Sequence, residues 1–357
     1  MMARFADVLT IVNGRNQKKV ENPNGRYPIY GSGGVMGYAD DYICEGNTVV
    51  IGRKGSINNP IFVETPFWNV DTAFGLCADP TKLSAKYLYY FCEKFDFEQL
   101  NTTVTIPSLT KTNLLNVQIP LPALDEQYRI VAVLDKVSGL IAKCQVQLDK
   151  LNLLVKARFA EIFDLNNCNF GLLRDNTEFI DYRGHTPTLS TDGKIRMVNA
   201  KSVGKGVFKY IDEFVSEETY TRWMRRGFAC PGDVLFVTEG HTFGNVCQVP
   251  KELVKFALGQ RVITIQGHKG VLDNTFLCAY MQTDRFIRDI NMYKTGGTAQ
   301  GIRSRDLEKI EVPLCPFSRQ EYFGKYVIQV EKMRTFINRS LENLKILKKA
   351  LMQEYFG

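Results

Sequence analysis

The sequence predicts an α+β protein in which two mixed α/β globular parts are joined by two long helices that form an antiparallel coiled coil. Three observations lead to this prediction. The chain has 357 residues, which is enough for two domains of about 150 residues each. Residues 119–164 align without a gap on residues 312–357, and both copies carry apolar residues at helical spacing. The two halves are therefore expected to form a pseudo-two-fold internal repeat.

The repeat is clearest in the last part of each half. At one constant offset, Pro120 aligns with Pro313 and Gln127 aligns with Gln320. A looser similarity relates residues 47–55 to residues 233–240. Each half is therefore interpreted as a variable globular part followed by a shared tail. The expected domains are residues 1–122 and 166–315 for the two globular parts, and residues 123–165 and 316–357 for the two helical tails.

Short β-branched and aromatic runs, bounded by Gly, Asn and Pro, predict strands in both globular parts. The first part is expected to have strands at residues 48–51 and 61–63, with an amphipathic helix at 82–94. The second part is expected to have strands at 234–238 and 261–265, with a helix at 275–289.

Each tail predicts one long helix with a coiled-coil seam. In the first tail, apolar residues recur at alternating steps of four and three, which is a heptad spacing. The second tail keeps the same register, with Arg334 at one seam position. Asp125 and the Ser318-x-x-Glu321 pattern are the expected N-terminal caps. The first seam consists of Ile130, Leu134, Val137, Ile141, Cys144, Leu148, Leu151 and Val155.

Two packing arrangements are compatible with these amphipathic tails. In one, each helix lies only on its own globular part, and in the other, the two helices pair with each other. Two matched heptad tracts of equal length favour pairing, and a polar seam residue such as Arg334 would then help to fix the register. A helix from residue 125 to 163 would be about 57 Å long at 1.5 Å per residue.

Composition narrows the class of protein. The net charge of +7 arises after residue 165 and is compatible with a polyanionic partner without requiring one. No apolar run is long enough for a membrane span, and Arg4 and Asp7 stand where a secretory signal would be hydrophobic. These features predict a cytoplasmic protein without membrane association. The nine cysteines form no C-x-x-C pair, which predicts reduced, mostly buried thiols rather than disulfides or a zinc site.

Motifs of common enzyme classes are missing from the sequence. The glycine cluster at residues 31–37 lacks the spacing of a dinucleotide-binding loop, and no phosphate-binding P-loop is present. The histidines at 185, 241 and 268 lack metal-ligand spacing, and no serine nucleophile elbow or amino-methyltransferase loop occurs. The sequence therefore points to recognition or scaffolding rather than catalysis.

The order of motifs, present twice, resembles the specificity (S) subunits of type I restriction-modification systems over nearly the whole chain. Both tails open with similar segments at residues 119–127 and 312–320, although Arg319 replaces Glu126 and Cys315 replaces the second proline. The helix motifs at residues 88–91 and 276–280 precede them. The remaining similar segments are residues 27–31, 51–55 and 67–71 in the first half, and residues 184–187, 240–244 and 258–261 in the second.

This resemblance implies two target recognition domains separated by conserved spacer helices. Such a subunit is non-catalytic and recognises a bipartite, asymmetric site in double-stranded DNA. It binds two modification subunits, which methylate adenine, and through them restriction subunits that translocate DNA. S-adenosylmethionine, ATP and Mg²⁺ would belong to those partners, so no cofactor or metal is expected in this chain.

Polar and basic residues in loops that differ between the halves are the candidates for DNA contacts, because such side chains bind base edges or phosphates. Three arginines of the second half are expected to face phosphate, namely Arg222, Arg225 and Arg226. The candidates for base contacts are Arg53, Lys54, Ser56, Asn58, Asn59 and Asn69 in the first half, and Arg183, His185, Thr186, Thr238, His241, Arg303 and Arg305 in the second.

Two other classes of function remain open from the sequence. One is a scaffold whose helices and globular parts bind proteins. The other is a two-domain enzyme with a dispersed site, which would require a pocket of titratable groups with perturbed pKa values.

Overall fold

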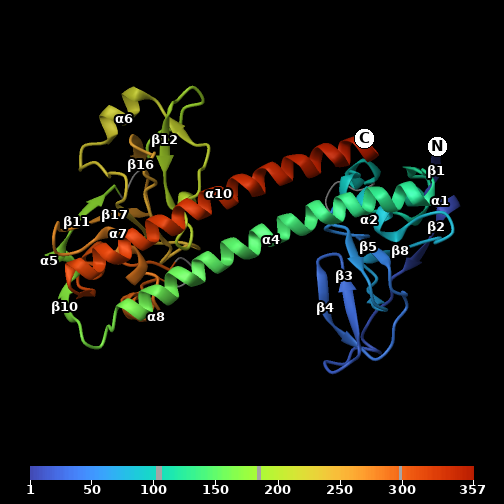
Figure 1. Cartoon of the computed structure of the whole chain (residues 1–357), viewed down its shortest axis with the longest axis horizontal. Helices are drawn as coiled ribbons and strands as arrows, with labels where there is room; N and C mark the ends of the chain where they lie inside the picture. The colour runs from blue at the N-terminus through green and yellow to red at the C-terminus, as the bar shows by residue number, and fades with distance from the viewer. Residues whose placement is uncertain (102–106, 183–185, 297–299) are drawn as a thin grey trace. The chain divides into compact units, whose positions relative to one another are not determined.

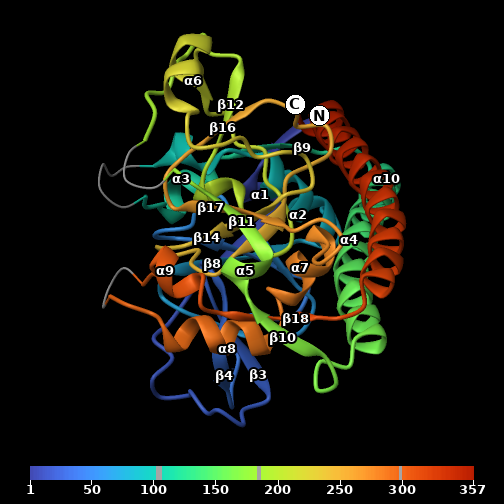
Figure 2. The ribbon, with the colours of Figure 1, turned by 90° about the vertical axis from the view of Figure 1, so that its left-hand side faces the viewer.

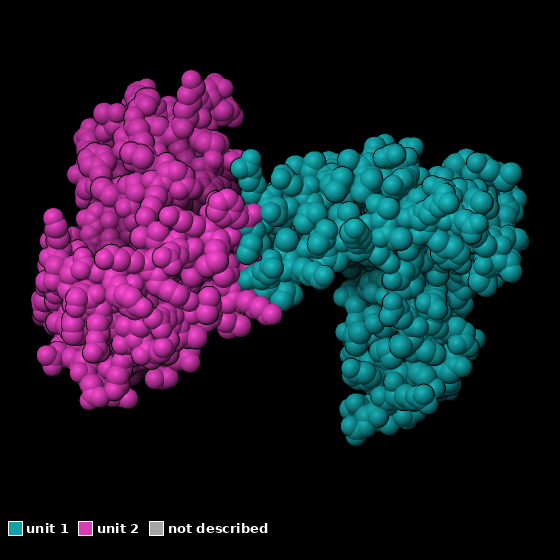
Figure 3. Space-filling model, viewed as in Figure 1, with its two compact units in different colours: residues 1–147, 337–357 teal, residues 148–336 magenta. Residues whose placement is uncertain are grey.

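The computed structural model describes residues 1–101, 107–182, 186–296 and 300–357, and these fall into two compact units. Unit 1 comprises Met1–Gln147 and Ile337–Gly357, and unit 2 comprises Leu148–Phe336 (Figure 3). Each unit contains a globular part and a segment of both long helices (Figure 1). Each globular part contains both helices and strands, which confirms the mixed α/β prediction.

The described residues of the globular part of unit 1 form three sheets. Their strand orders are β2-β8-β5-β6, β4-β3-β7 and β1-β9. Helix α2 packs on the four-stranded sheet and buries Tyr87, Leu88 and Phe91 in the main core of the unit. The elements are β1 (Met2–Arg4), α1 (Phe5–Val8), β2 (Leu9–Asn13), β3 (Tyr27–Gly31), β4 (Gly34–Ala39), β5 (Thr48–Gly52), β6 (Ile61–Val63), β7 (Trp68–Asn69), β8 (Ala73–Ala78), α2 (Ala85–Lys94), η1 (Phe97–Leu100), α3 (Lys111–Leu115) and β9 (Gln118–Pro120).

In unit 2, the part of the globular region that the structure describes also forms three sheets, with equivalent strand orders. These are β11-β17-β14-β15, β13-β12-β16 and β10-β18, and α7 packs on the four-stranded sheet. The elements are β10 (Asn169–Leu172), α5 (Leu173–Asn176), β11 (Thr177–Asp181), β12 (Ile195–Val198), η2 (Ala200–Ser202), β13 (Phe214–Val215), α6 (Glu217–Trp223), β14 (Val234–Val237), β15 (Val246–Gln248), β16 (Phe256–Leu258), β17 (Val262–Gly267), α7 (Asn274–Tyr280), α8 (Asp284–Met292), α9 (Ser304–Leu307) and β18 (Glu311–Leu314).

The internal repeat therefore extends through both globular parts, beyond the tails in which the sequence reveals it. Strand directions agree as well, since β3 pairs antiparallel with β4 and parallel with β7, as β12 does with β13 and β16. In the four-stranded sheets, Gly52 pairs with Ala73, and Val237 pairs with Val262. These pairings establish which residues of the two units are equivalent, although their side chains differ.

The two predicted long helices are confirmed as α4 (Leu124–Ile162) and α10 (Phe317–Phe356), which lie side by side (Figures 1 and 2). In unit 2, Phe159 near the end of α4 contacts Phe323 near the start of α10, with ring centroids 5.5 Å apart. In unit 1, Ile130 near the start of α4 shares a core with Met352 near the end of α10. The helices are therefore antiparallel in both units, as predicted.

The predicted seam is also found. Its α4 positions from Ile130 to Val155 are buried or half-buried, whereas most neighbouring positions are exposed. Arg334 Nη2 donates a hydrogen bond of 2.7 Å to Asn152 Oδ1 on α4, and Arg334 also pairs with Glu331. Burial raises the pKa of the Glu331 carboxyl, and the Arg334 guanidinium partly opposes that increase. The polar seam residue thus has a specific partner, which supports its predicted role in the helix register.

Both predicted helix caps are wrong. The helices begin at Leu124 and Phe317, so Asp125 and Ser318 lie in the first turn rather than before it. Backbone carbonyls of Ala123 and Pro316 accept the first helical hydrogen bonds. The polar side chains that stabilise these helix starts lie further along, at Gln127 and Gln320.

Gln127 and Gln320 fasten each helix to its globular part and are completely buried. Gln127 Oε1 accepts from Ser84 N at 2.8 Å, while Nε2 donates to Lys82 O and Pro122 O, both at 2.9 Å. Gln320 Oε1 accepts from Asp273 N at 2.8 Å, while Nε2 donates to Val271 O at 3.0 Å and Cys315 O at 2.7 Å. The glutamine that recurs in the repeat therefore attaches the long helix to the globular part in the same way in both units. We call Gln127 and Gln320 the glutamine joints.

Replacing Gln320 with Leu should destabilise unit 2 by about 2–4 kcal/mol, because three main-chain groups lose the hydrogen-bond partner that the buried Gln320 side chain supplies. Urea unfolding followed by circular dichroism measures the loss. Gln329→Leu, at an exposed position of the same helix, is the matched control and should leave stability within about 0.5 kcal/mol. Equal stability of the two variants would contradict the role assigned to the joint.

Two other predictions need correction. The helix expected at residues 275–289 is divided into α7 and α8, because Thr283 Oγ1 accepts from Phe286 N and starts a new helix. The cysteines are not all reduced, since Cys168 and Cys315 form a disulfide. Strands β10 and β18 pair Asn169 with Leu314, which brings the two flanking cysteines to a Cα separation of 5.4 Å. The two cysteines are 147 residues apart in the sequence, so no local cysteine motif indicates their disulfide.

Candidate nucleic-acid interface

The backbone of the loop after β5 in unit 1 is hydrogen-bonded to the backbone of neighbouring segments at three places. Arg53 N donates to Thr72 O at 2.8 Å, and Leu109 N donates to Arg53 O at 2.9 Å. Gly55 N donates to Pro107 O at 3.1 Å. Gly55 has a φ of +82°, a conformation that favours glycine. The loop therefore presents its side chains from a fixed backbone.

Unit 2 has the same arrangement in the loop after β14. Thr238 N donates to Arg261 O at 3.0 Å, Ile302 N donates to Thr238 O at 2.9 Å, and Gly240 N donates to Gln300 O at 2.9 Å. Gly240 has a φ of +93°. Together with the sheet pairings, these bonds make Thr238 equivalent to Arg53, Gly240 to Gly55, and Arg261 to Thr72. We call this pair of loops, residues 53–59 and 238–244, the equivalent loops.

Four of the six candidates in unit 1 are exposed on or next to this loop with side chains available to a ligand, namely Arg53, Lys54, Ser56 and Asn59. The Arg53 guanidinium lies 5.8 Å from the centre of the Phe74 ring, which supports its extended stem. Asn58 is exposed, but its amide is occupied. Asn58 Nδ2 donates to Asp96 Oδ1, and Asn58 Oδ1 accepts from Phe97 N, both at 2.7 Å.

Two candidates are wrong because their side chains are inside the fold. Asn69 is completely buried on β7, and its Nδ2 donates to Ala73 O at 3.2 Å. Thr238 is also completely buried, and its Oγ1 donates to Arg261 O at 3.3 Å. Both side chains hold the backbone around the equivalent loops and have no access to a base edge.

The remaining base-contact candidates of unit 2 lie in several loops and in helix α9. Thr186, His241, Arg303 and Arg305 are exposed, whereas Arg183 and His185 lie outside the described residues. Asp181 connects two of these loops, since its carbonyl accepts from Arg226 Nη1 at 3.2 Å and its Oδ2 accepts from Ser304 Oγ at 2.7 Å. The structure thus brings the segment around Arg226 close to the segment that carries Arg303 and Arg305.

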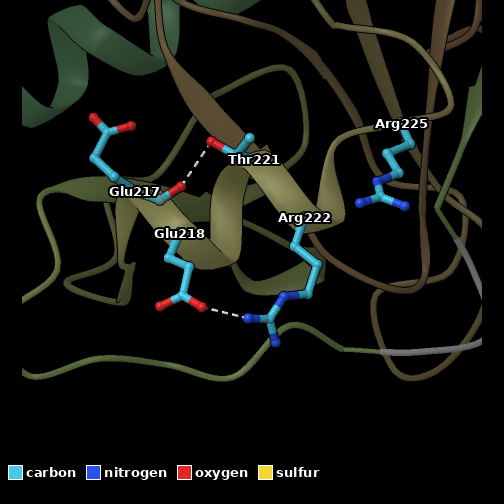
Figure 4. Close-up of a pocket in the computed structure, with 5 residues that line it drawn as sticks. All are labelled: Glu217, Glu218, Thr221, Arg222 and Arg225. Atoms are coloured by element: carbon cyan, nitrogen blue, oxygen red, sulfur yellow. Dashed lines mark hydrogen bonds and ion pairs between the residues drawn. The ribbon is translucent and has the colours of Figure 1, made fainter.

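Two of the predicted phosphate contacts lie at helix α6 (Figure 4). A shallow hollow of about 490 Å³ is lined by Glu217, Glu218, Thr221, Arg222 and Arg225. Arg222 forms an ion pair with Glu218 one turn earlier, whereas Arg225 stands apart from that pair. Since Glu218 already balances the charge of Arg222, Arg225 is the better placed of the two for a phosphate.

The residue that sequence reasoning missed is Arg261, directly before β17. Its guanidinium is half-exposed, and its Nε lies 3.1 Å from Glu239 Oε1. It has a φ of +69°, unusual for any residue other than glycine. The motif at residues 258–261 drew attention to the segment, but the backbone conformation that distinguishes Arg261 is invisible in the sequence.

A second surface lies on the helices of unit 1. A groove of about 600 Å³ runs between the end of α2 and the last turns of α10. Ile141, Ile346, Ala350 and Met352 form its apolar lining, and Ile346 is 67% exposed. Lysines surround this lining at positions 94, 345, 348 and 349, although Lys348 is paired with Glu93. The groove is suited to an amphipathic segment with acidic flanks.

Within the described residues, no group of three His, Cys, Asp or Glu side chains is placed to hold a metal ion. Burial raises the pKa of Cys44 and Cys247 to about 12, so these thiols are protonated and poor nucleophiles. Among the helices in the described part of the chain, none is long and apolar enough to cross a membrane.

The known proteins to which this chain is similar are type I restriction specificity proteins. Residues 1–152 match the family described as the type I restriction modification DNA specificity domain. The chain is 22% identical to S.HindORF215P of Haemophilus influenzae, which is assigned as a type I restriction enzyme specificity subunit, over 98% of this chain and 91% of that protein. It is 21% identical to the type I restriction enzyme MjaVIII specificity subunit of Methanocaldococcus jannaschii, over 74% of this chain and 68% of that protein.

Solved structures show the same fold. The S subunit of a type I restriction-modification system from M. genitalium is similar with a TM-score of 0.65 at 16% identity, covering 100% of this chain and 96% of that chain. A second structure, described as showing complex assembly and conformational transition of the type I R-M system, contains a chain that is similar with a TM-score of 0.55 at 16% identity. The similarity covers 99% of this chain and 97% of that chain. These similarities confirm the predicted fold class.

Proposed function

We propose that the chain is the DNA sequence-recognition subunit of a type I restriction-modification complex, because the proteins to which it is similar are specificity subunits of such systems. The target is a bipartite, asymmetric site in double-stranded DNA, and each unit recognises one half of it. The subunit is non-catalytic, and its role is to position the modification and restriction subunits on that site.

One observation carries this proposal. The equivalent loops have the same backbone hydrogen bonds in both units but different side chains, with Arg53 and Lys54 in one loop and Thr238 and Glu239 in the other. A constant backbone with variable side chains is suited to two different base sequences, because base edges are discriminated by the side chains that reach them. An asymmetric target follows from that difference.

The proposed partners are double-stranded DNA, two modification subunits that methylate adenine, and restriction subunits that associate through them. The lysine-rimmed groove of unit 1 supports partner binding, since it leaves an apolar strip of α10 uncovered. S-adenosylmethionine, ATP and Mg²⁺ would be bound by those partners, and this chain is expected to hold no cofactor. A complex that acts on chromosomal DNA places the protein in the cytoplasm.

Selection from a random duplex library tests the function. The chain, purified with its modification subunits, should enrich duplexes with two different short sequences at a fixed separation. The modification subunits without this chain are the control and should enrich no sequence. Binding of partners without any duplex preference would support a protein scaffold instead, and turnover by the chain alone would support an enzyme.

Replacing Arg53 with Ala should weaken binding to the cognate duplex by about 1–3 kcal/mol and relax specificity in one half-site only. The expected reason is loss of bidentate hydrogen bonds to a base edge. Arg26→Ala is the matched control, because Arg26 is in the same unit and also lies over an aromatic ring, 5.6 Å from the centre of Tyr27, but outside the loop. Equal weakening on all duplexes would assign Arg53 to the DNA backbone instead.

A further inference from the structure

Arg261 is held in an unfavourable backbone conformation by its surroundings. Its φ of +69° lies in the left-handed region, which a side chain with a Cβ rarely adopts. Its carbonyl accepts hydrogen bonds from both the backbone N and the Oγ1 of Thr238. A strained residue that the fold fixes in this manner is a candidate for a functional role.

The side chain of Arg261 is positioned as well. Its Nε pairs with Glu239 Oε1 at 3.1 Å, and both side chains are 52% exposed. A Cβ atom added to Gly240 would lie 3.8 Å from Arg261 Nη1, so the guanidinium lies along the glycine at the turn of the loop. Among the described residues, Nη1 and Nη2 have no hydrogen-bond partner. Glu239 therefore holds one edge of the guanidinium and leaves the terminal pair of amino groups available.

Unit 1 has the opposite distribution of charge at the equivalent positions. Lys54 stands where unit 2 has Glu239, and Thr72 stands where unit 2 has Arg261. In unit 1 the cations are Arg53 and Lys54 of the loop itself. In unit 2 the loop carries the carboxylate of Glu239, and the cation is Arg261 directly before strand β17. Each unit thus presents a cation at this place, but from a different strand.

We propose that Arg261 is a specificity-determining residue that recognises guanine in the half-site bound by unit 2, and that Glu239 is its positioning residue. This inference rests on the proposed function. The two terminal amino groups of arginine match the O6 and N7 acceptors of guanine in the major groove, which is the commonest specific contact of this side chain. A carboxylate at Nε orients that pair of donors and prevents the long side chain from adopting other rotamers.

Arg261→Gly is the decisive variant, since glycine accepts a positive φ without strain and should leave the fold as stable as before, or more stable. Its affinity for the cognate duplex should fall about 5- to 150-fold, the range for loss of one bidentate base contact. Library selection with the methyltransferase complex should lose the preference for guanine at one position of one half-site, while the other half-site is unchanged.

Two further variants separate base recognition from charge. Arg261→Lys keeps the charge and can still donate to guanine O6 and N7 but lacks the planar pair of donors, so it should restore part of the affinity with a weaker guanine preference than arginine gives. Glu239→Gln should lower that preference less than Arg261→Gly does. Lys269→Ala, which removes an exposed cation after the other end of β17, is the control and should keep the wild-type profile.

Two results would overturn the inference. They are an unchanged profile for Arg261→Gly, and a uniform loss of affinity on all duplexes with the profile retained. Failure of the proposed function would look different, because the wild-type complex would then enrich no duplex sequence and the variants would have no profile to lose.

Discussion

Exchanging residues 166–315 for the corresponding segment of another specificity subunit should change one half-site of the target and leave the other intact. The exchanged segment contains both strands of the β10–β18 pair and both cysteines of the Cys168–Cys315 disulfide. Each pair in the hybrid therefore comes from a single protein. The helical seam stays native, because its apolar packing involves α4 and α10 themselves. We therefore expect a hybrid target with a new second half and the original first half.

Sequencing of methylated adenines across the genome of cells that contain the hybrid and the proposed modification subunits measures this result. Exchange of residues 1–122 is the reciprocal control and should alter the first half-site alone. Some loss of stability is expected where the new segment meets Phe159 and Phe163 of α4, which are buried in the core of unit 2. A target altered in both halves would mean that the units do not recognise DNA independently.

Lengthening both helices should change the separation of the half-sites without changing their sequences. Helices α4 and α10 continue without a break through the boundaries of the units, at Gln147 and Phe336. Four residues inserted after each of these positions add about 6 Å of helix at 1.5 Å per residue. Since a base-pair step is about 3.4 Å, we expect the unread spacer to grow by one or two base pairs.

Insertion into α4 alone is the matched control. It shifts the α4 segment of unit 1 by four residues relative to the α4 segment of unit 2, so the two segments cannot both keep their native register with an unaltered α10, and the helices pair poorly. This variant should be less stable and bind DNA weakly, whereas the double insertion should bind well to the longer site. A double insertion that retained the original spacer would show that the helices do not set the separation.

The sequence predicted the elements that depend on periodicity. Apolar positions from Ile130 to Val155 predicted a seam, and α4 differs from the expected limits by one residue at each end. Strand β6 has the expected residues, and strands β5, β14 and β17 lie close to them. These patterns depend on which face of an element is buried, and that information is local.

What the sequence could not predict depends on contacts between distant segments. Arg53 and Thr238 are equivalent positions, yet one side chain is exposed and the other is buried. Residue type alone does not reveal that difference, which is why Thr238 and Asn69 were mistaken for base contacts. Cys168 and Cys315 meet because two distant strands pair, and the role of Arg261 depends on a positive φ. None of these features leaves a periodic signal.

The glutamine joints have a consequence for how such a protein can change. All six hydrogen bonds of Gln127 and Gln320 go to main-chain atoms, at Lys82, Ser84 and Pro122 in one unit and at Val271, Asp273 and Cys315 in the other. Main-chain N–H and C=O groups are the same in every residue except proline, which lacks the N–H. Substitutions can therefore accumulate throughout a globular part while its attachment to the helix stays intact, so that new DNA specificities can arise by recombination without a matching change in the helix.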